Sequence, residues 1–196
     1  MIIGLTGQTG AGKSTVCEFL KEKGISVIDC DKVAREVTEK GSPLLLVLSQ
    51  NFGGDILFED GSLNRRKLAE KAFSSEENTQ LLNSLTHPEI TRKIEQKIKE
   101  CQTEHVILDA PTLIESGAYK MCQKIISVVA CENLRKQRII ERDNLTVSEA
   151  ETRIKAQKED SFYAEHSDFV ISNDGDRDSL LENIKKALKE IGVDAK

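Results

Sequence analysis

Short runs of apolar and β-branched residues alternate along the chain with longer stretches in which apolar residues recur every three or four positions. The short runs are typical of buried strands, and the longer stretches are typical of amphipathic helices. The strand-like runs occupy residues 2–5, 25–28, 105–109, 125–130 and 169–173. Strands that alternate with helices predict an α/β fold, in which helices flank a parallel sheet and right-handed crossovers join its strands.

Between residues 63 and 101 the strand-like runs give way to helix signals. Ser74–Glu77 and Thr86–Glu89 each match the capping box, in which a Ser or Thr begins a helix and a Glu follows three residues later. After the second box, isoleucines recur at four-residue spacing. We therefore expect a helical insertion over 63–101, within one domain that spans 1–196.

Further helices are expected on both sides of this insertion. Residues 32–40 and 44–52 carry helical patterns, and the glycine-rich turns within 53–61 predict a loop or a short hairpin. After the insertion, residues 134–143 form a basic helical pattern, and Thr146–Glu149 is a third capping box. A short mobile lid is expected in this last region.

The first strand-like run leads directly into a glycine-rich stretch and then into a helical pattern. Residues 7–14 match G-x-x-x-x-G-K-[ST], the phosphate-binding loop of nucleotide-binding proteins. Glycines let the backbone point its N–H groups at a phosphate, and the positive end of the following helix faces the same anion. Lys13 is expected to reach the β- and γ-phosphates of a nucleotide, and the Ser14 hydroxyl to bind Mg²⁺.

Carboxylates follow two of the predicted strands. Asp29 and Asp31 come after the second strand, and parallel sheets bind ligands at the carboxyl ends of their strands. We expect at least one of this pair to contact substrate, although Asp31 also fits the N-cap of the next helix. Asp109 ends the third strand and has the form of a Walker B aspartate, which helps to hold Mg²⁺, commonly through water.

Two groups of basic residues are candidates for binding anions. Residues 65–67 form the cluster Arg-Arg-Lys, for which a solvated helix face and an anion contact are both open interpretations. Arg135, Arg138 and Arg142 are spaced three and four apart and are expected to share one helix face. An ordinary surface helix would explain the spacing, but with a nucleotide site upstream we favour a phosphate clamp, with Arg138 and Arg142 as its first members.

Composition and charge narrow the function classes. The chain of 196 residues is 38% hydrophobic and 31% charged, which is typical of a globular protein, and its net charge of −5 argues against broad nucleic-acid binding. Its apolar runs are all too short to span a membrane, and the first is not a signal peptide. The five cysteines are scattered without a C-x-x-C motif, so we expect reduced thiols, no zinc site and a cytoplasmic location.

The ordered set of motifs resembles the dephospho-CoA kinase family over nearly the whole chain. The phosphate loop alone indicates only a superfamily, whereas Asp-x-Asp, Leu-Asn-Arg and His-Pro in this order are much more specific. The matching segments are Gly4–Gly7, Gly12–Val16, Val27–Asp31, Ala34-Arg35, Gly61–Arg65, Leu82-Asn83, His87-Pro88, Asp109–Pro111, Leu113, Glu115, Arg138, Arg142-Asp143, Gln157, Asp168–Ile171, Asn173 and Gly175.

The resemblance implies ATP-dependent phosphorylation of the ribose 3′-hydroxyl of dephospho-CoA, which gives CoA and ADP. It implies a P-loop core, a CoA-binding helical subdomain over 63–101 and a lid over 138–160. Asp31 would orient or deprotonate the 3′-hydroxyl, with Lys13 and Arg138 as the other catalytic residues. The residues implied to bind ATP are Gly10, Ala11, Gly12, Lys13, Ser14, Thr15, Arg142, Asn173 and Gly175.

On the acceptor side the resemblance implies contacts from Asp29, Arg65 and His87, and for the metal it implies Ser14 and Asp109. For His87 an equal alternative is packing in the first helical turn after a Thr86 cap. The partners expected are the small molecules ATP and dephospho-CoA, with no nucleic acid or membrane and with a monomer or small homo-oligomer as the assembly.

The chain departs from the family pattern at two positions. Gln8 stands where the family usually has Gly, and Thr112 stands where Leu is usual. Neither change removes a phosphate or metal ligand. Two alternatives to this function are a P-loop kinase for another small molecule, such as a nucleoside or shikimate, and a GTP-dependent switch. A switch usually reads guanine with N-K-x-D, and the sequence has no such tetrapeptide.

Overall fold

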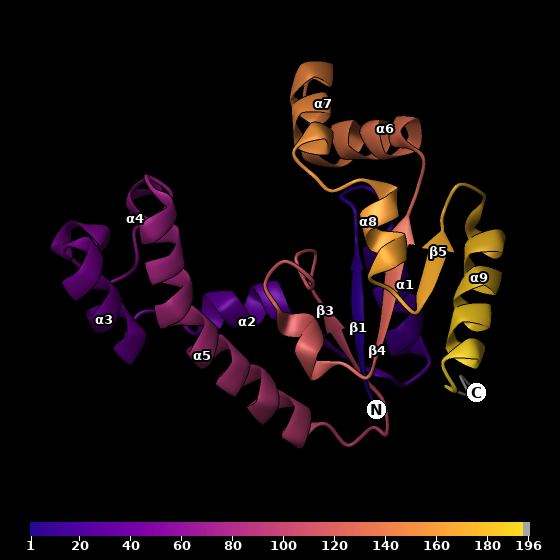
Figure 1. The fold of residues 1–196 in the computed structure, drawn as a ribbon, viewed down its shortest axis with the longest axis horizontal. Coiled ribbons are helices and arrows are strands. Elements are labelled where there is room, and N and C mark those ends of the chain that lie inside the picture. Colours follow the sequence, from indigo (N-terminus) through magenta and orange to yellow (C-terminus); the bar gives the residue numbers. More distant parts are fainter. Residues whose placement is uncertain (194–196) are drawn as a thin grey trace. The chain divides into compact units, whose positions relative to one another are not determined.

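The computed structural model describes residues 1–193 and contains a five-stranded sheet (Figure 1). The strand order is β2-β3-β1-β4-β5, and β1 pairs in parallel with β3 and β4, as β4 does with β5. The strands are β1 (Ile2–Gly7), β2 (Ser26–Asp29), β3 (Val106–Asp109), β4 (Lys124–Val129) and β5 (Phe169–Ser172). The predicted α/β class is confirmed, because helices separate and flank these strands.

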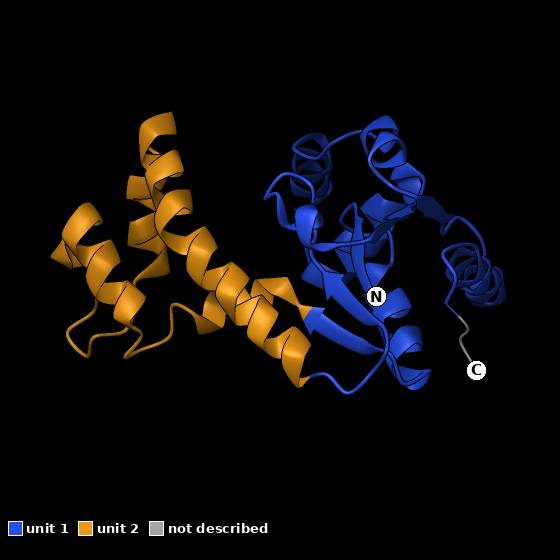
Figure 2. Ribbon diagram, turned by 60° about the horizontal axis from the view of Figure 1, so that its bottom comes forward, with its two compact units in different colours: residues 1–28, 101–196 blue, residues 29–100 orange. Residues whose placement is uncertain are grey.

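The chain divides into two compact units, which Figure 2 colours separately. Unit 1 comprises Met1–Ile28 with Cys101–Lys196, and unit 2 comprises Asp29–Glu100. The helices of unit 1 are α1 (Lys13–Glu22), α6 (Glu132–Asp143), α7 (Val147–Lys155), α8 (Asp160–Glu165) and α9 (Arg177–Glu190), with a 3₁₀ turn at Ala118–Met121.

Unit 1 has its main core between the sheet and two helices, α1 and α9. Ile126 and Val128 of β4 join that core, together with Leu20 of α1 and Ile184 of α9. Side chains alternate between the two faces of a strand, so Ser127 points to the other face, where its hydroxyl bonds that of Ser167 just after α8. The sheet is therefore covered on both faces, as its continuous apolar strands require.

Unit 2 is helical. Its elements are α2 (Cys30–Glu36), α3 (Pro43–Phe52), a 3₁₀ turn (Gly54–Ile56), α4 (Arg65–Ala72) and α5 (Glu76–Glu100). A small core of its own includes Leu48, Phe52, Ile56 and Ala72. Over 53–61, where a loop or a short hairpin is expected, the structure has a loop with one antiparallel bridge between Leu57 and Leu63.

Of the three expected helix starts, the one at Thr86 is wrong, the one at Ser74–Glu77 is confirmed with its cap shifted by one residue, and the one at Thr146 is confirmed. Thr86 lies inside α5, where its hydroxyl donates to the carbonyl of Leu82, so its match to a capping box is accidental. Ser75 rather than Ser74 accepts the backbone N–H three residues on, from Asn78, at 3.1 Å. Thr146 and Glu149 form both hydrogen bonds of a capping box at the start of α7.

The remaining helix boundaries differ modestly from expectation. The predicted helix over 32–40 begins earlier, at Cys30, and its α-helical part ends at Glu36. The helix predicted over 44–52 is α3, which Ser42 caps and Pro43 begins. Within residues 1–193, none of the helices is both long and apolar enough to cross a membrane.

Replacing Leu48 with Ala tests the core of unit 2. Leu48 has no exposed surface, so Leu48→Ala should lower the free energy of unfolding by about 2–5 kcal/mol, measured by urea denaturation. Leu46 of the same helix is 64% exposed, and Leu46→Ala is the matched control, expected within about 0.5 kcal/mol of the unchanged protein. Equal losses from the two variants would contradict this account of the core.

Candidate active site

The phosphate loop between β1 and α1 is a tight turn that depends on glycine. Gly7, Gly10 and Gly12 all have positive φ angles, of 146°, 77° and 96°. A Cβ atom at Gly10 would lie 2.8 Å from the carbonyl oxygen of Arg135, and one at Gly7 would lie 2.9 Å from the backbone nitrogen of Val128. The loop therefore needs glycine both for its backbone angles and for the close approach of neighbouring backbone.

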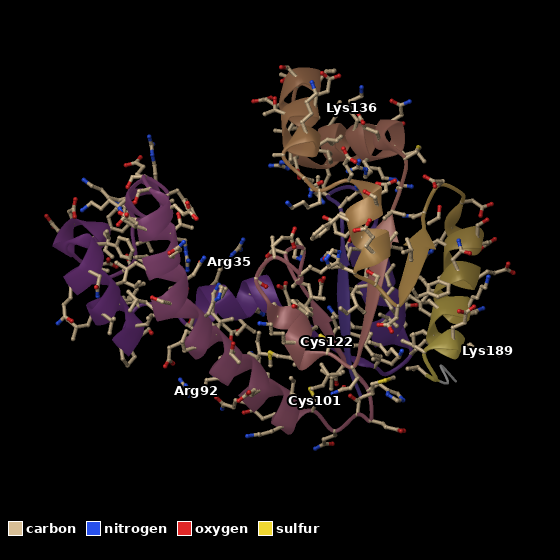
Figure 3. All side chains as sticks on the ribbon, in the orientation of Figure 1. Arg35, Arg92, Cys101, Cys122, Lys136 and Lys189 are labelled. Atoms are coloured by element: carbon tan, nitrogen blue, oxygen red, sulfur yellow. The ribbon has the colours of Figure 1, made fainter. Side chains whose placement is uncertain are left out.

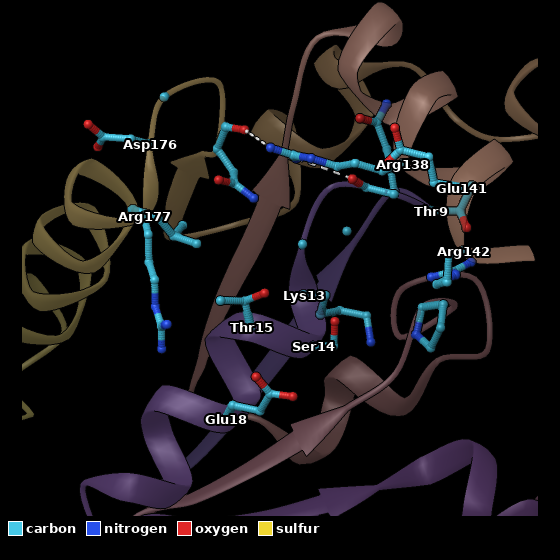
Figure 4. Close-up of a pocket in the computed structure, with 18 of the residues that line it drawn as sticks. Thr9, Lys13, Ser14, Thr15, Glu18, Arg138, Glu141, Arg142, Asp176 and Arg177 are labelled. Atoms are coloured by element: carbon cyan, nitrogen blue, oxygen red, sulfur yellow. Dashed lines mark hydrogen bonds between the residues drawn. The ribbon is translucent and has the colours of Figure 1, made fainter.

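Side chains from two distant segments bind the carbonyl groups of this loop. Arg138 donates to the carbonyl oxygens of Gly10, at 3.3 Å, and of Asn173, at 3.2 Å, as the dashed lines in Figure 4 show. The buried amide of Asn173 donates to the carbonyl oxygen of Ala11 at 2.7 Å. With its carbonyls bound from outside, the loop is fixed in a shape that suits anion binding by its N–H groups.

The loop and the first turn of α1 line a cavity of about 1020 Å³, the one drawn in Figure 4. Of the residues expected to bind ATP, all but Ala11 line it: Gly10, Gly12, Lys13, Ser14, Thr15, Arg142, Asn173 and Gly175. Ala11 belongs to the loop but is fully buried, and its carbonyl oxygen accepts the Asn173 amide. The positive end of the α1 dipole and the Lys13 ammonium make the cavity suitable for a polyphosphate.

Lys13 forms an ion pair with Asp109, and both side chains are about five-sixths buried. The pairing follows from topology, because β3 lies beside β1 with Asp109 opposite Leu5 in the register. Burial, followed by the nearby Asp109 carboxylate, raises the pKa of the Cys17 thiol to about 12. Cys17 therefore stays a neutral thiol beneath the loop and is no candidate for a nucleophile.

The three arginines of α6 lie on one face of the helix, as their spacing predicts, but they have different environments. Arg138 and Arg142 line the cavity, whereas Arg135 is buried and donates to the carbonyl oxygen of Ala130 at 3.0 Å. Arg142 makes two 2.8 Å hydrogen bonds to Asp143. These bonds, with a further one from Arg153, hold the pKa of the partly buried Asp143 carboxyl at about 2.

Unit 2 contains the expected acceptor-side residues. Asp29, not Asp31, is the N-cap of α2, and its carboxylate accepts the backbone N–H of Lys32 at 2.8 Å. Asp31 lies exposed in the first turn of that helix. Arg65 begins α4 and donates to the carbonyl oxygen of Arg35, which Figure 3 labels, at 3.3 Å.

His87 lies in the middle of α5, so the expectation that it packs in a first helical turn is wrong. It precedes Pro88, which interrupts the helical hydrogen bonds, and the two residues line a shallow hollow with Asn83, Thr91 and Arg92. In the 65–67 cluster, Arg66 bonds Glu70 at 3.0 Å and Lys67 lies 3.3 Å from Asp55. The cluster is therefore largely paired within its own unit.

The donor set fits Mg²⁺ bound mainly through nucleotide and water. Within the described part of the chain, His, Cys, Asp and Glu side chains form no group of three or more that could hold a metal alone. Mg²⁺ keeps several waters and takes one or two protein ligands with substrate phosphates. The Ser14 hydroxyl at the cavity and the Asp109 carboxylate behind it are groups of this kind.

Several residues that line the cavity were missed from the sequence. Glu141, Asp176, Arg177 and Leu180 belong to α6 and the start of α9. Asp176 is the N-cap of α9 and accepts the backbone N–H of Ser179 at 2.9 Å. The D-x-x-S spacing at 176–179 was a readable signal for a helix start beside the expected nucleotide loop.

Comparisons with known proteins agree with this geometry. The family model described as Dephospho-CoA kinase matches residues 1–179. Dephospho-CoA kinase of Corynebacterium diphtheriae is 42% identical over 190 residues, which cover 95% of this chain and 94% of the relative.

Two solved structures share the fold over nearly the full length. The crystal structure of TT1252 from Thermus thermophilus superimposes with a TM-score of 0.82 and 29% identity, covering 97% of this chain and 95% of that one. Dephospho-CoA kinase from Campylobacter jejuni gives a TM-score of 0.70 and 26% identity, covering 97% and 96%. With the phosphate loop and its cavity in place, these matches establish that the chain belongs to the dephospho-CoA kinase family.

Proposed function

We propose that this chain transfers the γ-phosphoryl group of ATP to the ribose 3′-hydroxyl of dephospho-CoA, producing CoA and ADP in the last step of coenzyme A biosynthesis. The observation that carries the proposal is the cavity over the glycine-dependent phosphate loop, lined by Lys13, Ser14 and Arg138 in a member of this family. Phosphoryl transfer has a loose transition state, so positioning and positive charge supply most of the catalysis.

The donor half of the reaction is assigned to unit 1. The loop N–H groups and Thr15 hold the phosphates, Lys13 leaves Asp109 for the β- and γ-phosphate oxygens, and Arg138 stabilises charge on the transferring group. Arg142, Asn173 and Gly175 complete the nucleotide contacts. Ser14 and Asp109 would hold Mg²⁺, and the ion would neutralise phosphate charge.

The acceptor half is assigned to residues of unit 2. Asp31 follows β2 by two residues, matches the family's Asp-x-Asp motif, and is proposed to orient or deprotonate the 3′-hydroxyl. Asp29, Arg65 and His87 are proposed to contact dephospho-CoA. Because Asp29 Oδ1 already caps α2, its Oδ2 is the atom proposed to contact dephospho-CoA. The segment 63–101 is proposed as the CoA-binding subdomain.

The α6–α7 hairpin is proposed as the lid over 138–160. Its helices pack through Ile139, Ala150 and Ile154, and it carries Arg138 and Arg142 at the cavity. A lid of this kind keeps water from the γ-phosphate, which prevents hydrolysis in place of transfer. We further propose a cytoplasmic enzyme that works as a monomer or small homo-oligomer.

Acceptor selectivity tests the proposed reaction. ADP release, followed in a coupled assay with ATP and Mg²⁺, should depend on dephospho-CoA and should fall to background with shikimate or a nucleoside. Chelation of Mg²⁺ with EDTA should abolish it, because phosphate charge is then left unneutralised. Faster turnover with shikimate or a nucleoside than with dephospho-CoA would assign the chain another acceptor.

Asp31→Asn tests the role of Asp31. An amide keeps the size of the side chain but cannot accept the hydroxyl proton, so kcat should fall by about 10²-fold or more while the Kd for ATP stays within a few-fold. The kcat comes from the same assay, and the Kd from calorimetric titration. Collapse of ATP affinity would instead make Asp31 a ligand of the metal or the nucleotide.

A further inference from the structure

Gln8 connects the phosphate loop to the segment that follows α7. Its side chain is 97% buried, and its Nε2 donates to the Asp160 carboxylate at 2.7 Å and to the Lys158 carbonyl oxygen at 3.2 Å. The next residue, Thr9, donates its backbone N–H to Gln157 Oε1 at 3.0 Å. Three hydrogen bonds therefore join two consecutive loop residues to residues 157–160, which lie about 150 positions away in sequence.

The chemistry of these partners fixes the orientation of the Gln8 amide. Both partners of Nε2 are oxygen acceptors, so a reversed amide would set its own oxygen against a carbonyl and a carboxylate. Gln8 Oε1 has no hydrogen-bond partner among residues 1–193, so the side chain of Gln8 acts only as a donor, through Nε2.

The segment that Gln8 holds is the base of the α6–α7 hairpin. Besides the apolar contacts of Ile139 with Ala150 and Ile154, Lys136 lies 3.2 Å from Glu151, and Arg153 bonds Asp143. These links make the hairpin one packed piece. It contacts the phosphate loop at two places, through Arg138 on the Gly10 carbonyl and through residues 157–160 on Gln8 and Thr9.

We propose that Gln8 is a positioning residue, which fixes the base of the α6–α7 hairpin to the phosphate loop and thereby sets Arg138 and Arg142 over the nucleotide cavity. Gln8 and Gln157 themselves line that cavity, so the link lies beside the phosphates it would serve. This inference rests on the proposed kinase function for its catalytic readout. The attachment of α7 to the phosphate loop through Gln8 does not depend on which molecule accepts the phosphoryl group.

Gln8→Glu is the sharpest variant, because it keeps the size of the side chain and replaces the donor with a charged acceptor. It should lower kcat about tenfold or more through misplaced arginines, while the KM for dephospho-CoA stays within about twofold. Gln137 of α6 is the matched control, because it is exposed and donates to Glu141 at 2.9 Å. Gln137→Glu should leave kcat within about twofold.

Rescue variants separate positioning from folding. Asp160→Asn keeps an oxygen for Gln8 to bond and should stay within about twofold of the unchanged enzyme. Combined with Gln8→Glu, it supplies a donor to the new carboxylate and should restore kcat at least about threefold over Gln8→Glu alone. If Gln8→Glu does not fold, Gln8→Ala takes its place, with an expected loss in kcat of about threefold or more.

The kinetics are measured well below the unfolding midpoint of each variant, together with hydrogen exchange of the α7 amides. Support requires a fall in kcat for the Gln8 variant with faster exchange in α7. Unchanged kcat, a loss that only follows the unfolded fraction, or an equal loss in Gln137→Glu overturns the proposal. If the unchanged protein does not phosphorylate dephospho-CoA, the proposed function fails instead, and α7 exchange still decides whether Gln8 holds the hairpin.

Discussion

The site depends on the binding of phosphate-loop carbonyl groups by side chains from elsewhere in unit 1. Arg138 binds Gly10, and Asn173 binds Ala11. Each bond satisfies a backbone oxygen of the loop, and loop N–H groups that have no partner within residues 1–193 can then bind an anion. An unsatisfied buried carbonyl costs about 1–3 kcal/mol, so these contacts stabilise the loop before any ligand arrives.

The same contacts explain why glycine is required at several positions. A side chain at Gly10 would meet the backbone of Arg135, and one at Gly12 would meet the Asn173 amide that binds the loop. The close approach of α6 and of the β5–α9 loop is therefore possible only with a bare backbone. Helix α6 also supplies Arg138 and Arg142 to the cavity, and the β5–α9 loop supplies Asn173 and Gly175. The elements that pack against the glycines of the phosphate loop are therefore the same ones that line the cavity.

Much of the fold and the core of the site could be predicted from the sequence. The strand runs, the phosphate loop and Asp109 behind it follow from local patterns whose meaning depends on a few neighbouring residues. Helix starts were less predictable, because a capping-box sequence such as Thr86–Glu89 can also occur inside a helix, as it does in α5. In α5, continued packing of the helix outweighs both the cap signal and Pro88.

Side-chain partners over long sequence distances could not be predicted. The spacing of Arg135, Arg138 and Arg142 indicates one helix face, but it contains no information on which arginine the Ala130 carbonyl binds. Asp29 rather than Asp31 caps α2, because β2 ends at Asp29 and the helix begins at the next residue. Local sequence predicts such a boundary only to within a few residues. The sequence likewise gives no sign that Gln8 and Thr9 form hydrogen bonds with residues 157–160.

We propose that the charge essential for transfer is that of Lys13 in the phosphate loop, not that of the basic cluster at residues 65–67. The most direct measurement compares kcat of Lys13→Ala with kcat of Arg65→Ala, Arg66→Ala and Lys67→Ala, each at saturating dephospho-CoA. Lys13→Ala should cost about 10²-fold or more, and each cluster variant should cost less. Equal losses from Lys13→Ala and a cluster variant would contradict this account.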